Sequence, residues 1–146
     1  MRIYFDNCCL QRPLDDSSLP RVSRETVAIL SLLKRCEKGD VDFVASDAHR
    51  FEIERNTNAE RRDHGLELLT LAKSWVKTDA EVEKRARDFR EAGMSALDAL
   101  HLGAAVCGKA DYFCTCDDEI IRKTRRLEGL ESKVVNPIEL ARELER

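Results

Sequence analysis

The stretch Ser95-Ala96-Leu97-Asp98-Ala99-Leu100-His101-Leu102-Gly103-Ala104-Ala105-Val106-Cys107-Gly108 has the composition of a helix that a protein buries in its interior. Apolar side chains lie on nearly every face of a helix drawn through it, and hardly any polar face is left for solvent. It nevertheless contains the acid Asp98, and a buried acid has to be paired or bound to a metal ion. The stretch therefore predicts a central helix that carries a candidate functional carboxylate.

Outside this helix, short apolar runs alternate with stretches of helical periodicity. Strands are expected at residues 3–5, 41–45, 75–77, 112–115 and 134–135. Helices are expected at 22–38 with Gly39 at the end, after a cap at Ser46, around 68–72, behind a capping box at 78–81, at 120–127, and after a cap at Asn136 with Pro137 in the first turn. Alternation of strand and helix predicts a mostly parallel sheet covered by helices on both faces. We therefore predict that residues 1–146 form a single three-layer α/β domain.

The size and charge of the chain limit the classes of function. Its 146 residues suit one domain, and no repeat or low-complexity tract divides them. There is no apolar run long enough to cross a membrane and no secretion-like N-terminus, so we expect a cytoplasmic protein without membrane contact. The net charge of −3 argues against a general polyanion binder, so a nucleic-acid partner would need a local basic patch.

The six cysteines are expected to be free thiols that pack as small buried hydrophobes. They are Cys8, Cys9, Cys36, Cys107, Cys114 and Cys116. A chain with 36% charged residues is unlike a disulfide-stapled secreted scaffold, and the cytoplasm keeps thiols reduced. Cys114-Thr115-Cys116 is one residue shorter than the usual Cys-x-x-Cys zinc clip, so the spacing does not predict that clip.

Acidic residues follow two of the expected strands, where sites form in open parallel sheets. Asp6 follows the first strand, and Asp117, with Asp118 beside it, follows the fourth. Glu52 and Asp98 lie on helices that could point to the same place. Carboxylates that meet there would need a cation among them, and Mg²⁺ prefers such oxygen ligands. A cation of this kind favours phosphodiester hydrolysis without a side-chain nucleophile.

Each acid also has a structural interpretation. Asp6 could begin a turn, Asp98 could complete a capping box with Ser95, and Asp117 could cap the following helix. Glu52 could be a solvated helix acid. Helical geometry, however, places it near the face of Ala48 and Phe51, whereas the alternative acid Glu54 points roughly opposite.

Five segments of the chain carry a resemblance. They are residues Ile3-Tyr4-Phe5-Asp6, Ser46-Asp47-Ala48-His49-Arg50-Phe51-Glu52-Ile53, Ala96-Leu97-Asp98-Ala99-Leu100-His101-Leu102-Gly103-Ala104-Ala105, Tyr112-Phe113-Cys114-Thr115-Cys116-Asp117 and Val134-Val135-Asn136-Pro137. Together they resemble the PIN-domain family, and within it the small prokaryotic VapC-like proteins. The third segment is the most specific match, and the resemblance runs nearly from end to end.

The resemblance implies a PIN-like domain that acts as a Mg²⁺- or Mn²⁺-dependent endoribonuclease. Such proteins are often the toxin of a toxin–antitoxin pair, so it implies an RNA substrate, an antitoxin partner and a homodimer. The implied catalytic and metal-binding acids are Asp6, Glu52, Asp98 and Asp117. Thr115 would orient a carboxylate or water, and Asp118 could assist.

The chain departs from the family pattern after the first acid. A hydroxyl residue followed by Asn is common there, whereas this chain has Asn7 and Cys8, so Asn7 is kept as a supporting candidate. Arg12 is the basic residue best placed to contact RNA, because it follows Asp6 in an expected loop. His101 is interpreted as a polar core histidine in preference to a metal ligand, because an oxygen-rich site suits hard cations, and His49 and His64 are expected at the surface.

Two other functions compete with the ribonuclease. A PIN-fold protein-binding module with little or no nuclease activity would suit the acidic balance. A phosphoacceptor of receiver type could use Thr115 and Lys133, but it would need paired acids after the first strand, which are missing.

Overall fold

The computed structural model describes residues 1–145, and its centre is a five-stranded parallel sheet. The strands are β1 (Arg2–Phe5), β2 (Asp42–Ser46), β3 (Ser74–Val76), β4 (Tyr112–Cys114) and β5 (Lys133–Val135). Their order in the sheet is β3-β2-β1-β4-β5, so β1 lies in the middle. This confirms the predicted α/β architecture with a parallel sheet.

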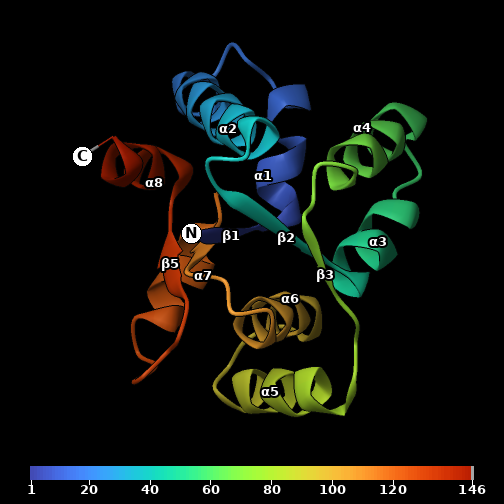
Figure 1. Ribbon diagram of the computed structural model, residues 1–146, viewed down its shortest axis with the longest axis vertical. Helices are drawn as coiled ribbons and strands as arrows, with labels where there is room; N and C mark the ends of the chain where they lie inside the picture. Colours follow the sequence, from blue (N-terminus) through green and yellow to red (C-terminus); the bar gives the residue numbers. More distant parts are fainter. Residues whose placement is uncertain (146) are drawn as a thin grey trace.

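Helices cover both faces of the sheet (Figure 1). They are α1 (Asn7–Gln11), the short 3-10 helix η1 (Arg12–Leu14), α2 (Pro20–Lys38), α3 (Asp47–Glu54), α4 (Ala59–Leu69), α5 (Ala80–Glu91), α6 (Ala96–Cys107), α7 (Asp118–Thr124) and α8 (Pro137–Leu144). In Figure 1, α5 and α6 lie on one side of the sheet, while α1, α2, α4 and α8 lie on the other. None of the helices described within residues 1–145 combines the length and the apolar character that a membrane span requires.

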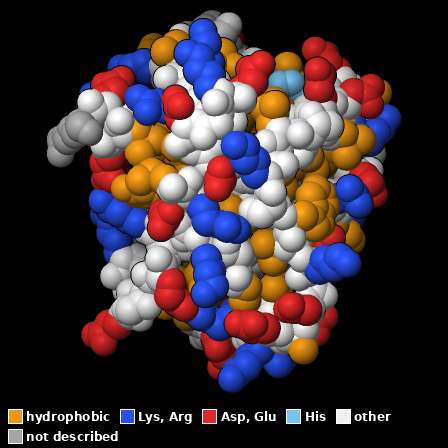
Figure 2. Space-filling model, in the orientation of Figure 1, with side chains coloured by type: hydrophobic (Ala, Val, Ile, Leu, Met, Phe, Trp, Pro, Cys, Tyr) orange, Lys and Arg blue, Asp and Glu red, His pale blue; other side chains and the backbone are white. Residues whose placement is uncertain are grey.

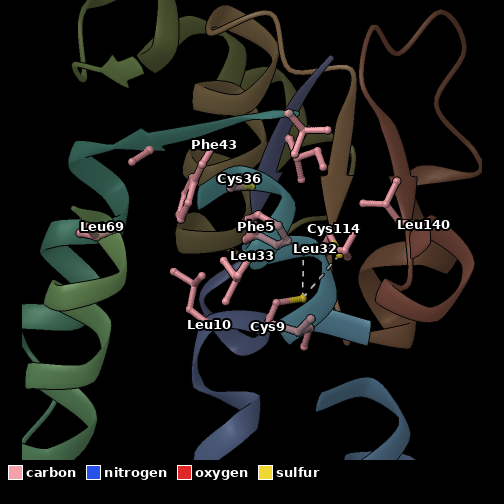
Figure 3. Packing of buried hydrophobic residues seen from close by; sticks show 14 of the residues in the cluster. Phe5, Cys9, Leu10, Leu32, Leu33, Cys36, Phe43, Leu69, Cys114 and Leu140 are labelled. Carbon is pink, nitrogen blue, oxygen red and sulfur yellow. Dashed lines mark hydrogen bonds between the residues drawn. The ribbon is translucent and has the colours of Figure 1, made fainter. Parts of the chain in front are cut away.

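The central strand β1 supplies side chains to the cores on both faces. Ile3 and Phe5 belong to the core formed with α2 and α8, whereas Tyr4 belongs to the core formed with α5 and α6. This follows from the two-residue period of a strand, which sends neighbouring side chains to opposite faces. Figure 3 shows the first core, where Phe5 lies near Leu32 of α2, with Leu140 of α8 on the same face of the sheet.

The predicted central helix is α6. Ala99, Leu102 and Ala105 are fully or almost fully buried in the second core. Gly103 lets α6 approach α5 closely, because a Cβ at this position would lie 3.1 Å from the carbonyl oxygen of Val82. The burial of α6 confirms the interpretation of its apolar sequence.

Three predicted helix ends are also confirmed. The Ser46 hydroxyl accepts a hydrogen bond from the backbone N–H of His49 at the start of α3. Asn136 caps α8, and Pro137 takes its first position. Gly39 ends α2 with a φ of +85°, a left-handed conformation that glycine adopts without a Cβ penalty.

Some predicted boundaries were wrong. The capping residue of α5 is Asp79 and not Thr78, because the Asp79 carboxylate accepts from the N–H of Val82 at 2.9 Å. Leu71 and Ala72 lie beyond the end of α4. The short helices α1 and η1 were not predicted, since five and three residues are too few to display a helical period.

The predicted surface position of His49 was also wrong. His49 is fully buried, stacks on Tyr4 with ring centroids 4.3 Å apart, and bonds the carbonyl oxygen of Phe5. Burial lowers the pKa of His49 to about 3, so the ring is neutral near pH 7. His64 is half-buried, and its Nε2 lies 2.8 Å from the carbonyl oxygen of Leu10.

Candidate metal centre

Asp6 lies at the carboxyl end of β1, between the central strand and α1. Its side chain is buried, with Oδ2 accepting from the Thr115 hydroxyl at 2.8 Å and from the Cys8 thiol at 3.2 Å. Burial, reinforced by the proximity of Cys8, raises the pKa of Asp6 well above its ordinary value. The environment therefore disfavours a negative charge on this acid unless a positive charge joins it.

Glu52 reaches the same region from α3 and bonds His101 of α6. Glu52 Oε1 lies 2.7 Å from His101 Nε2, and His101 Nδ1 lies 2.6 Å from the Tyr4 hydroxyl. The Tyr4 hydroxyl is in turn 2.6 Å from that of Ser46. If Nε2 carries the His101 proton and donates to Glu52, then Tyr4 donates to Nδ1 and Ser46 donates to Tyr4. One arrangement of protons satisfies the whole network.

This network sets the charge of Glu52. Burial raises the pKa of Glu52, but the hydrogen bond and charge attraction from His101, together with a hydrogen bond from Asn7, outweigh burial and leave the pKa below its ordinary value. Glu52 is therefore an ionised acid whose orientation is fixed by a buried histidine. Its neighbour Glu54 is exposed and lies 3.9 Å from Arg50. The choice of Glu52 over Glu54 from helical geometry agrees with this placement, although Phe51, assigned to the same inward face, is half exposed.

The ligand atoms of Asp6, Glu52 and His101 all lie within 4.8 Å of one another. We call this group the carboxylate cluster. Sequence reasoning identified Asp6 and Glu52 but favoured a core role for His101 over a role as a ligand. His101 is fully buried, as expected, and also belongs to the cluster. His101 lies three residues after Asp98, so the two side chains lie on one side of α6. This spacing is the sequence feature that could have indicated a role for His101 in the site.

Asp98 and Asp117 are not members of this compact group within residues 1–145. Asp98 is half-buried in the first turn of α6, and its N–H donates to the Ser95 hydroxyl. Asp117 is exposed and caps α7, its carboxylate accepting from the N–H of Glu119 at 2.9 Å. Its own N–H donates to the Thr115 hydroxyl, which ties it to Asp6 through one residue. Their role as metal ligands remains a prediction.

The supporting candidates divide into two groups. Thr115 is fully buried and bonds Asp6, as the resemblance implied, and the buried Asn7 hydrogen-bonds Glu52. Asp118 instead points to Arg21, whose two terminal nitrogens each lie 2.8 Å from its oxygens. Arg12 lies in η1 rather than in a loop, and its guanidinium is paired with Asp15 and the buried Glu25.

Comparison with known proteins bears on the fold. No protein-family model matches the sequence, and no curated protein matches it. The structure is similar to that of VapBC2 from Rickettsia felis bound to a DNA fragment from their promoter, with 11% identity, 93% of this chain and 98% of that chain covered, and a TM-score of 0.62. It is also similar to FitAcB from Neisseria gonorrhoeae, with 19% identity, coverages of 92% and 97%, and a TM-score of 0.57.

The fold of this chain is PIN-like. At these identities the likeness concerns the fold, so the chemistry of the site depends on the chain's own residues. In a parallel sheet of this kind, the carboxyl ends of the strands are the expected place for a site, and the carboxylate cluster lies there.

The donor set of this PIN-like fold suits a hard divalent cation. Asp6 is a desolvated carboxylate, and Glu52 is a second one beside it. The side chain of Asn7 hydrogen-bonds Glu52, and its amide oxygen Oδ1 is buried and has no hydrogen-bond partner among the described residues. Mg²⁺ and Mn²⁺ bind oxygen ligands of this type, and a cation would offset both the buried charge and the orphaned amide oxygen.

Proposed function

We propose that this chain is a divalent-metal-dependent endoribonuclease and the toxin of a toxin–antitoxin pair. The observation that carries the proposal is the carboxylate cluster at the carboxyl end of β1, in which Asp6 and His101 are buried and Glu52 is half-buried. The PIN-like fold supports it, because the cluster occupies the edge of the sheet where the family resemblance places the catalytic acids. The alternative remains a PIN-fold protein-binding module with little or no nuclease activity.

Each residue has a distinct task in this proposal. Asp6 and Glu52 would hold the Mg²⁺ or Mn²⁺ ion, with Asp98 and Asp117 completing the acidic edge. The bound ion would supply an activated water and stabilise the charge that develops on the phosphate. The Thr115 hydroxyl fixes the orientation of Asp6, and His101 does the same for Glu52. Asn7 would contribute its unpartnered amide oxygen to the same place.

The surface charge bears on the substrate. The chain carries a net charge of −3, and Lys and Arg side chains alternate with Asp and Glu on the face shown in Figure 2. RNA binding would therefore rely on local contacts near the site and not on a broad basic surface. Arg12, our predicted RNA contact, would first have to break its ion pairs with Asp15 and Glu25. This charge distribution is the feature that favours the protein-binding alternative.

The partner is part of the proposal. The solved structure of VapBC2 is bound to a DNA fragment from their promoter. We propose that this chain likewise works with an antitoxin protein, that it forms a homodimer and that it acts in the cytoplasm. A short reading frame beside its gene, whose product copurifies with the chain, is the observation expected for such a pair.

The test is cleavage of end-labelled RNA by the purified chain. We expect cleavage with Mn²⁺ or Mg²⁺, none with a chelator, and a loss of about 100-fold or more in Asp98→Asn and Glu52→Gln. Matched controls are Glu54→Gln, exposed on the same helix as Glu52, and Asp118→Asn, which is held by Arg21. Both should cleave normally. A folded chain that binds its partner but cuts no RNA under any metal condition would favour the binding module.

A further inference from the structure

A second cluster of ligands lies beside the carboxylate cluster and contains sulfur in place of oxygen. Cys8 and Cys9 come from α1, Cys114 is the last residue of β4, and Cys116 lies in the segment that follows β4. The sulfur atoms of Cys8, Cys9 and Cys116 all lie within 4.8 Å of one another. We call these three residues the thiol cluster. Figure 3 shows Cys9 pointing at Cys114, the fourth sulfur of the region, across the buried core.

The thiol cluster is formed by tertiary contacts, and the spacing of its cysteines in the sequence does not predict it. More than a hundred residues separate Cys9 from Cys116, yet their sulfur atoms are 3.6 Å apart. The backbone N–H of Cys116 also donates to the Cys8 sulfur at 3.3 Å. β1 and β4 are parallel neighbours in the sheet, so the residues that follow them are held against each other before any ligand arrives.

The sulfur spacing fits a tetrahedral metal ion. Zinc–sulfur bonds of about 2.3 Å place two thiolates of one tetrahedron roughly 3.8 Å apart. The distance from the Cys9 sulfur to that of Cys116 is 3.6 Å, and all three sulfur atoms of the thiol cluster lie within 4.8 Å of one another. A disulfide needs sulfur atoms about 2.0 Å apart, so these cysteines would have to move much further to form one.

The surroundings suit a cation with bound thiolates. Cys9 and Cys116 are buried, whereas Cys8 is half-buried and gives a route from solvent. The Arg12 guanidinium also lies near Cys116, although it is already paired with Asp15 and Glu25. All six cysteines of the chain are free thiols, so none of these ligands is lost to a disulfide.

We propose that Cys8, Cys9 and Cys116 form a binding site for a soft, thiophilic divalent ion of the Zn²⁺ class. This site is separate from the carboxylate cluster, because thiolates select soft ions whereas carboxylate and amide oxygens select Mg²⁺ or Mn²⁺. The two sites touch at Cys8, whose thiol donates to Asp6. The proposal does not depend on ribonuclease activity.

Cd²⁺ is the probe, since cadmium–thiolate bonds absorb in the ultraviolet whereas cadmium–carboxylate bonds do not. The fully reduced chain is titrated with Cd²⁺ in excess Mg²⁺, which occupies oxygen ligands. We expect a charge-transfer band that saturates at one equivalent and that Zn²⁺ displaces. Cys9→Ser and Cys116→Ser should each weaken Cd²⁺ binding by about 10-fold or more.

The chain provides matched controls for these variants. Cys36 is buried like Cys9 and Cys107 is half-buried like Cys8, and neither belongs to the thiol cluster. Cys36→Ser and Cys107→Ser should therefore keep the band, as should Asp98→Asn, which removes an acid but no thiol. If the buried variants fail to fold, the half-buried Cys8→Ser gives the same test. No band at stoichiometric Cd²⁺, or a band unchanged in all three cluster variants, overturns the proposal.

Discussion

Asp6 shows how one residue combines a structural cost with a functional use. Its carboxylate is buried at the end of the central strand and accepts hydrogen bonds from Thr115 and Cys8. Because burial raises the pKa of Asp6, its negative charge disfavours the folded state in the absence of a cation. A divalent ion would remove that penalty, which is the physical reason for a carboxylate to occupy such a position.

We predict that Asp6→Asn stabilises the metal-free protein at pH 7 by about 1 kcal/mol, or roughly 2–4 °C in Tm. The folded-state pKa of Asp6 lies above the unfolded value of about 3.9. The contribution of Asp6 to the free energy of unfolding is therefore fully present below about pH 3.9 and is lost as pH rises through the folded-state pKa. The variant should lack this loss. Urea unfolding with chelator from pH 4 to pH 8 measures it.

Asp118→Asn is the control with the opposite sign. The hydrogen bond from Arg21 lowers the pKa of Asp118. The contribution of Asp118 to the stability of the fold is therefore present above its unfolded pKa and is lost as pH falls. If Asp6→Asn proves clearly less stable than the wild type at pH 7, Asp6 serves chiefly as the acceptor for Thr115.

Other residues of the site illustrate what a sequence conceals. Asp6 and Glu52 could be predicted because an acid after a strand and an acid on an inward helix face are local patterns. The hydrogen bond between Glu52 and His101 joins residues 49 positions apart, and the one between Tyr4 and His101 joins residues 97 positions apart. No local period encodes such contacts, so the sequence favoured a core role for His101 over a role as a ligand.

At the scale of elements, the sequence of α6 suits only the buried core of the protein. Its apolar residues enter the second core, and its small residues allow α5 to pack closely against it. Gly103 lies at this contact, where a Cβ would be 3.1 Å from the Val82 carbonyl oxygen and 3.2 Å from the Ala86 nitrogen. Both neighbours are backbone atoms, which cannot rotate away.

Gly103→Ala is therefore predicted to destabilise the protein by about 1–3 kcal/mol, since α5 must be displaced. Helix propensity alone predicts the reverse, because alanine is favoured over glycine inside a helix by about 0.5–1 kcal/mol. The sign of the change in the free energy of unfolding, measured by urea titration, decides between packing and propensity. A stabilised variant would mean that α5 and α6 are less tightly packed than the structure indicates.

At the scale of the whole molecule, the order of the strands creates the candidate site. β1 pairs in parallel with both β2 and β4, so their carboxyl ends share one edge of the sheet. Asp6 follows β1, Thr115 follows β4, and α3, which carries Glu52, starts directly after β2. The central place of β1 thus brings three distant segments to one point.

Mn²⁺ that binds at the carboxylate cluster should stabilise the folded chain by mass action. At about 100 times its dissociation constant, an ion that binds only the folded state adds about 2.7 kcal/mol to the free energy of unfolding. We expect this gain in the wild type and in Glu54→Gln, and a much smaller one in Glu52→Gln. Thermal melting with and without Mn²⁺ measures it without reference to activity. An equal gain in both variants would place the ion elsewhere.

The sequence by itself determined the α/β class, the buried helix α6, the caps at Ser46 and Asn136, and the acids Asp6 and Glu52 as candidates. These follow from local periodicity and from the residue that begins or ends an element. Only the tertiary structure decided the order of the strands, the partnership of Glu52 with His101 and the meeting of the cysteines of α1 with Cys116. Such contacts depend on which strands become neighbours, and that choice is made by packing of the entire chain.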